Sequence, residues 1–138
     1  MTDLSFIRFK YSYVPQHHMK DTYLSDCCGV ENIKESEFYD AYKIFFGTLF
    51  SQSRLKIINL LRNKGKMCVT ELVKKLKLDQ TGISHDLTRL KKCGFVQVEV
   101  KGKYRYYSLN KKTIKPIMEL IDKHMSNYCI HILRGKTK

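Results

Sequence analysis

The chain has 138 residues, 43% of them hydrophobic and 28% charged, and a formal net charge of +13. That length fits one domain of ordinary size, and no apolar run reaches the ~20 residues needed to span a bilayer. We therefore expect no membrane segment. Because the first twenty residues lack a secretion signal, we also expect a cytoplasmic protein.

The positive charge is concentrated in the middle of the chain. Between Arg54 and Lys112 there are sixteen Lys and Arg residues against four Asp and Glu, whereas residues 1–35 carry a net charge of −1. Such a concentrated positive field attracts a polyanion, most commonly nucleic acid. A lysine-rich surface that is merely solvated is the alternative. Charge alone also leaves an RNA-binding module open beside DNA binding.

Residues 1–35 show no sustained hydrophobic period and contain Pro15 and Gly29, so we expect an arm that is loosely ordered or ordered only by docking. The chain has five cysteines, an odd number that argues against a disulfide framework when no secretion signal is present. Each thiol is then either buried packing or a ligand. The five are Cys27, Cys28, Cys68, Cys93 and Cys129.

Four amphipathic helices are predicted after the arm, from the recurrence of apolar residues at helical spacing. The first is expected to be capped by Ser36 and the second by Ser51 or Ser53, the third to begin at Val69 or Thr70 (with Thr70 as a possible cap), and the fourth at Gln80. The first helix has a wide aromatic stripe, part of which we expect to pack on a second subunit. The fourth buries Ile83, Leu87 and Leu90 and stops at Gly94, a residue typical of helix ends.

A β-hairpin and a last helix are predicted next. Residues 95–100 alternate apolar and polar side chains and indicate a strand, Lys101–Lys103 forms the tip, and residues 104–109 return. Asn110 is expected to cap the last helix. Together these elements predict a mainly α domain with a small β-hairpin wing, a winged helix-turn-helix over residues 36–128. A basic tail follows at 129–138.

The predicted layout indicates how DNA is read. The second helix of such a pair enters the major groove with its N-terminal residues at the base edges. Glutamine can pair bidentately with adenine, and basic side chains suit phosphates. The expected base readers are Gln80, Thr81, Ser84 and His85, and the expected backbone contacts are Arg89, Lys101, Lys103 and Arg105. A solvated helix face would not explain why hydrophobic stripe, hairpin and charge agree.

The stretches FFGTLFSQSRLKIINLL and MCVTELVKKLKLDQTGISHDLTRLKKCGFVQVEVKGKYRYYSL resemble the ArsR/SmtB family of metal-sensing repressors over roughly residues 38–125. The resemblance implies a DNA-binding repressor and not an enzyme. It also implies a homodimer joined by its first and last helices, bound to a palindromic operator until an inducer releases it. The family's usual proline is missing from the SQSR stretch.

The resemblance also implies where inducer sites lie. At the last-helix site the matching residues are Lys111, Thr113, His124 and Asn127. Only His124 can ligate a metal, so we expect this site to be absent. At the third-helix site the usual Cys-Val-Cys is replaced by Cys68-Val69-Thr70, and threonine is no substitute for a soft ligand.

Cys27, Cys28 and Cys68 resemble the layout of some arsenite sensors, in which an arm pair joins a single cysteine of the other subunit. Three thiolates suit As(III) or Sb(III), and with His17 or His18 the cluster would suit Cd²⁺, Pb²⁺ or Zn²⁺. The alternatives are thiol-redox sensing by the same cysteines and a regulator without a metal site. A thiol enzyme is disfavoured because the adjacent pair lacks Cys-x-x-Cys spacing.

Overall fold

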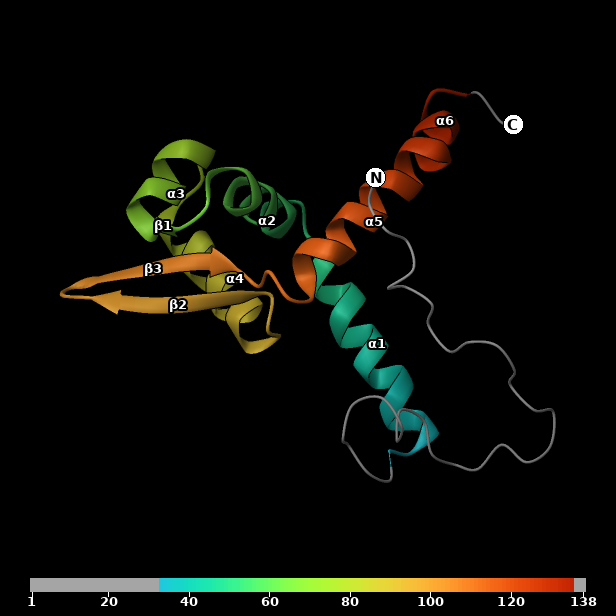
Figure 1. Cartoon of the computed structure of the whole chain (residues 1–138), viewed down its shortest axis with the longest axis horizontal. Helices are drawn as coiled ribbons and strands as arrows, with labels where there is room; N and C mark the ends of the chain where they lie inside the picture. Colours follow the sequence, from blue (N-terminus) through green and yellow to red (C-terminus); the bar gives the residue numbers. More distant parts are fainter. Residues whose placement is uncertain (1–32, 136–138) are drawn as a thin grey trace. The chain divides into compact units, whose positions relative to one another are not determined.

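A computed structural model of the chain describes residues 33–135 (Figure 1). The chain divides into two compact units, Met1–Tyr42 and Lys43–Lys138, and the boundary falls inside helix α1 (Glu35–Leu49). The second unit contains five further helices: α2 (Gln52–Lys64), α3 (Val69–Leu76), α4 (Gln80–Lys92), α5 (Ile114–Asn127) and α6 (Cys129–Leu133). In the described residues, no helix has the length and apolarity to cross a membrane.

The ends of α2 and α4 are set by local sequence. Ser51 precedes α2, and its Oγ accepts a hydrogen bond from the Arg54 N–H at 3.5 Å. Gly94, at φ 74°, follows α4 in a conformation that residues with a side chain rarely adopt. The predicted starts at Ser51 and Gln80 and the stop at Gly94 are confirmed.

Three predicted caps are wrong. Ser36 lies inside α1, which begins at Glu35, and Thr70 is the second residue of α3. Thr113, not Asn110, holds the cap position of α5. Cys68 takes the cap position of α3, because its backbone is still extended at φ −86° and ψ 168°. The reason is a short strand, β1 (Met67–Cys68), that the sequence did not reveal and that pairs with a strand of the hairpin.

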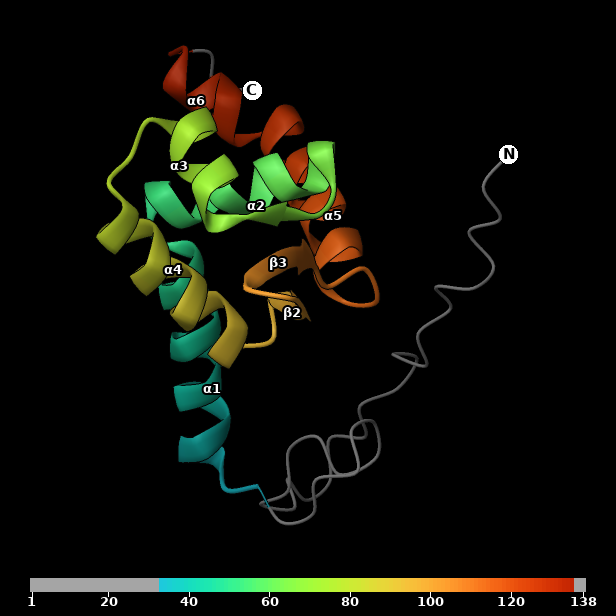
Figure 2. The same ribbon diagram turned by 90° about the vertical axis from the view of Figure 1, so that its left-hand side faces the viewer.

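The three strands form one antiparallel sheet in the order β1-β3-β2, with β2 at Val96–Lys101 and β3 at Tyr104–Leu109. Gly102 has a positive φ of 59° at the first central turn position, as in type II′ hairpins. Beyond the short β1, the hairpin β2–β3 projects past α3 and α4 (Figure 1), and Figure 2 shows it foreshortened. The wing is therefore where the sequence placed it.

The hydrophobic core of the second unit lies between α2, α3, α4, the base of the sheet and the start of α5. Its buried members include Ile57, Ile58, Leu61, Leu72, Phe95, Val96, Leu109, Ile114 and Met118. The predicted α4 stripe is confirmed, since Ile83, Leu87 and Leu90 are at most 1% exposed. This burial fixes which face of α4 stays in contact with solvent.

Candidate nucleic-acid interface

The exposed face of α4 carries the four polar residues expected to read bases, namely Gln80, Thr81, Ser84 and His85. Their spacing puts Thr81 and His85 opposite the buried stripe and Ser84 at its edge, and Gln80 is exposed in the first turn. Asp79 starts the helix, because its Oδ2 accepts a hydrogen bond from the Gly82 N–H at 2.7 Å. The capped first turn therefore presents short polar side chains, which are what base edges in the major groove require.

The basic residues expected on the wing are also exposed, at its tip and along β3. Lys103 Nζ lies 5.4 Å from the centroid of the Tyr104 ring, and within residues 33–135 neither Lys103 nor Arg105 has an acidic partner. Lys101 differs, since its Nζ lies 3.4 Å from Glu99 Oε1. Lys103 and Arg105 thus offer the more available charges for phosphate.

An ion pair that the sequence did not reveal joins β2 of the wing to the segment after α2. Lys66 Nζ donates a hydrogen bond to Glu99 Oε2. The hydrogen bond from Lys66, with a further contribution from Lys101, lowers the pKa of the Glu99 carboxyl below its usual value. The same bond raises the pKa of Lys66. Both groups are therefore charged at neutral pH, and their exposed ion pair joins the middle of β2 to the segment after α2.

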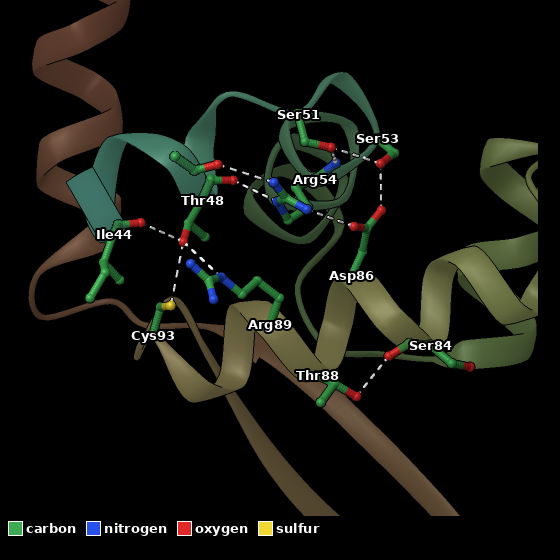
Figure 3. A network of polar contacts seen from close by, with 11 residues as sticks. Ile44, Thr48, Ser51, Ser53, Arg54, Ser84, Asp86, Thr88, Arg89 and Cys93 are labelled. Atoms are coloured by element: carbon green, nitrogen blue, oxygen red, sulfur yellow. Dashed lines mark hydrogen bonds and ion pairs between the residues drawn. The ribbon is translucent and has the colours of Figure 1, made fainter.

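A polar network holds α4 against the start of α2 (Figure 3). Arg54 Nη1 donates to Asp86 Oδ1 at 3.1 Å, and Ser53 Oγ donates to the other carboxylate oxygen. The rest of the guanidinium caps the end of α1, since Nε donates to Thr48 O at 2.6 Å and Nη2 to Gly47 O at 3.1 Å. Asp86 lies on α4, so this arrangement fixes the position of the recognition helix.

Thr48 is the second centre of this network, and its side chain is 0% exposed. Its Oγ1 donates to Ile44 O at 2.7 Å and accepts from Arg89 Nε at 3.3 Å. Cys93 Sγ lies 3.4 Å away (Figure 3). Arg89, expected to contact phosphate, thus also has a partner inside the protein, and its phosphate contact stays a prediction. Cys93 packs against the core, as expected for a structural cysteine.

Cys68 has a different environment from Cys93. In the sheet register Met67 pairs with Tyr107 and Cys68 with Tyr106. Because successive residues of a strand point to opposite faces, buried Met67 faces the core and Cys68 faces away from it. Cys68 is half-buried, and its N–H donates to Glu71 Oε2 at 2.8 Å. The alternative that Cys68 is core packing is therefore disfavoured.

Within residues 33–135, no three His, Cys, Asp or Glu side chains cluster closely enough to hold a metal. Cys68 is therefore not a metal site by itself. The other predicted ligands, Cys27 and Cys28, lie outside the described residues, as do His17 and His18. His124 lies on α5 beside Tyr128, with ring centroids 4.8 Å apart. Of the three predicted thiolate ligands, the described residues include Cys68, a half-buried thiol on the outer face of the sheet.

The fold and the exposed face of α4 define a winged helix-turn-helix regulator. Residues 51–98 match the family model described as bacterial regulatory protein, arsR family. An uncharacterized HTH-type transcriptional regulator of Methanocaldococcus jannaschii is 35% identical over 86 residues, 62% of this chain and 97% of that protein. The arsenical resistance operon repressor of Bacillus subtilis is 31% identical over 61% of this chain and 80% of that protein. This chain belongs to the ArsR family of transcriptional regulators.

Other relatives differ in the ion that their names report. The cadmium resistance transcriptional regulatory protein CadC of Listeria innocua is 34% identical over 55% of this chain and 64% of that protein. Among solved structures, Rv0081 of Mycobacterium tuberculosis has a TM-score of 0.61 at 25% identity and covers 65% of this chain and 90% of its own. The homodimeric winged helix-turn-helix domain Mb0332 of Mycobacterium bovis also has a TM-score of 0.61, at 22% identity. It covers 66% of this chain and 83% of that chain. The winged-helix fold is thereby confirmed.

Proposed function

We propose that this protein is a repressor that reads its operator with the first turns of α4 and grips the flanking backbone with the wing. The observation that carries the proposal is the set of exposed polar side chains at the start of α4, a helix with a fully buried stripe, together with an exposed basic hairpin. Regulators of this class distinguish sequences by base contacts and gain most of their affinity from phosphate contacts.

Gln80→Ala is expected to lower affinity for the upstream promoter DNA about tenfold, with little effect on an unrelated duplex, because one bidentate base contact contributes ~1–3 kcal/mol of discrimination. Fluorescence anisotropy with both duplexes measures the ratio. An equal loss on both duplexes would contradict base reading by Gln80, and no binding to any duplex at moderate salt would overturn the repressor proposal.

Lys103→Gln is the matched comparison, because Lys103 is an exposed cation without an acidic partner in the described residues. It is expected to weaken binding to both duplexes alike. The slope of log K against log salt should fall by about one, the effect of one lost phosphate contact. The two variants together separate base reading from backbone gripping.

We further propose that the protein acts as a homodimer on a palindromic operator. Much of the apolar stripe of α5 is not used by its own core, since Leu120 is 59% and Met125 38% exposed. Ile117, Leu120, Ile121, His124 and Met125 line an open, mainly apolar hollow of about 410 Å³. An apolar helix face of this kind fits a second copy of the chain, and a two-fold dimer reads a palindrome.

Leu120→Asp is expected to convert the dimer to a monomer, because the new carboxylate would be buried unpaired at the interface. Sedimentation velocity measures the change. The same helix provides the control, Lys123→Ala, which alters an exposed polar position. A dimer that is equally stable in both variants would place the interface elsewhere.

We also propose that a thiophilic ion releases the repressor, with arsenite the first candidate and antimonite, Cd²⁺, Pb²⁺ and Zn²⁺ the others. Cys27 and Cys28 would join Cys68, whose side chain faces away from the core. The names of the relatives, an arsenical repressor and a cadmium regulator, support an ion of this kind. Thiol-redox sensing by the same residues is the second candidate. The test is anisotropy on the promoter DNA with each ion in turn.

A further inference from the structure

A basic hollow of about 550 Å³ lies where the end of α2, the wing and the start of α5 meet. Leu61 and Leu109 contribute apolar lining. Gln97, Glu99 and Ser108 come from the sheet face opposite the core, as their register shows. The volume is in the range of small-molecule sites. Neither α4 nor the wing tip contributes to the lining, so this hollow is separate from the base-reading surface.

The charges in this hollow are strongly unbalanced. Its lining holds five cationic side chains, those of Arg62, Lys66, Lys111, Lys112 and Lys115, against the single acid Glu99. Lys66 already pairs with Glu99. The three lysines at the start of α5 have no acidic partner within residues 33–135. The hollow therefore carries a net positive charge that the described part of the protein does not neutralise.

The start of α5 adds to this field. Its first turn contains no acidic residue, and the positive end of the helix dipole lies beside three lysines of the same sign. The backbone has little left to donate, because the Ile114 and Lys115 N–H groups both donate to Asn110 O at 3.1 Å and Pro116 has no N–H. Side chains, not the helix backbone, would therefore hold an anion here.

Arg62 is a partly buried cation in this lining. Its Nη2 lies 2.7 Å from Asp122 Oδ2, but Nη1 is buried without a hydrogen-bond acceptor in the described part of the chain. A buried charged donor without an acceptor is costly, and native structures usually supply one. Because Nη1 itself is buried, an anion in the hollow would reach it only after the Arg62 side chain turns outward.

We propose that this hollow binds a phosphate-bearing anion through Arg62, Lys112 and Lys115. Lysine binds phosphate as a point charge and arginine as a planar donor, and both kinds are present. Two kinds of ligand carry such a phosphate. One is a free polyphosphate or phosphate ester, and the other is a backbone phosphate of DNA outside the bases read by α4. This proposal stands whether or not an ion releases the repressor.

The test uses the full chain and the double variant Lys112→Gln/Lys115→Gln, with Lys56→Gln/Lys123→Gln as the control. All four lysines are exposed, and each variant removes two positive charges. Calorimetric titration with sodium pyrophosphate should show one site per chain in the wild type. The test variant should bind about tenfold more weakly, a loss of ~1.4 kcal/mol, and the control should match the wild type.

A second arm tests the DNA source. If free pyrophosphate does not bind, the slope of log K against log salt for promoter DNA should fall by about two in the test variant and remain unchanged in the control. Either result supports the site and identifies its source. Equal pyrophosphate binding in both variants, or no binding together with equal slopes, overturns the proposal. Gln80→Ala tests the repressor function separately.

Discussion

Arsenite is expected to release the wild-type protein from its promoter DNA and to leave Cys68→Ser bound. A hundredfold drop in DNA affinity requires a coupling free energy of about 2.7 kcal/mol between ion and DNA binding. Because an ion shifts the equilibrium only through differential affinity for the two conformations, losing one of three thiolates should remove most of that coupling. A hydroxyl does not replace a thiolate for a soft centre.

In this structure, Cys68→Ser is expected to remove the thiol and leave the surrounding fold unchanged. Cys68 caps α3 with an extended backbone, and serine is among the preferred residues at that position. The hydrogen bond from the Cys68 N–H to Glu71 Oε2 involves only the backbone of residue 68, so serine keeps it. We therefore expect Cys68→Ser to fold and bind DNA like the wild type, and to differ only in its response to the ion.

The measurement is anisotropy on promoter DNA with a non-thiol reductant present, so that thiol oxidation does not contribute. Cys129→Ser is the matched control, since Cys129 is a half-buried thiol at the start of α6. It should respond like the wild type. Equal release of Cys68→Ser and wild type would sink the three-thiol proposal, and release only after the reductant is removed would favour redox sensing.

Asp86→Ala is expected to lower the free energy of unfolding by about 2–3 kcal/mol. The Arg54 and Asp86 side chains are 21% and 14% exposed, so the pair is mostly buried and its loss leaves a guanidinium with one uncompensated face. Breaking a fully buried pair costs ~3–5 kcal/mol, and the residual exposure reduces that figure. The Ser53 hydroxyl also loses its carboxylate acceptor.

Urea unfolding followed by circular dichroism measures this loss, as a lower midpoint at an unchanged slope. Glu119→Ala is the control, because Glu119 is an exposed acid on α5. It should change stability by less than about 0.5 kcal/mol. DNA affinity should also fall in Asp86→Ala at temperatures where it remains folded, since Asp86 anchors α4. An unfolding midpoint equal to that of the control would rule out this anchoring role.

Most of the helices and strands that were predicted correctly followed from local sequence signals. Burial at helical spacing placed Ile83, Leu87 and Leu90 in the core, and Gly94 marked the end of α4. Because residues on one helix turn are close in sequence, the exposure of Thr81 and His85 followed from the same spacing. The charged tip at Lys103 likewise followed from a period-two pattern broken by Gly102.

Tertiary contacts decided the rest, because they join residues far apart in the chain. Nothing in the local sequence singled out Thr48, yet its hydroxyl accepts a hydrogen bond from Arg89, 41 positions later. No local sequence pattern predicts the ion pair between Arg54 and Asp86, because each residue alone has the pattern of a solvent-exposed charge. The basic hollow has the same origin: its cations come from α2 and from the start of α5, which only folding brings together.

For Cys68 the sequence determined the residue type and its place near the start of α3, which is enough to suggest a thiolate ligand. Which way its side chain faces was decided by β1, a two-residue strand too short to leave a hydrophobic period. Pairing of Met67 with Tyr107 turns the methionine into the core, and the alternation of the strand then turns Cys68 to the outer face. A chemical identity is local, but an orientation depends on the partner strand, and here that partner lies almost forty residues later in the chain.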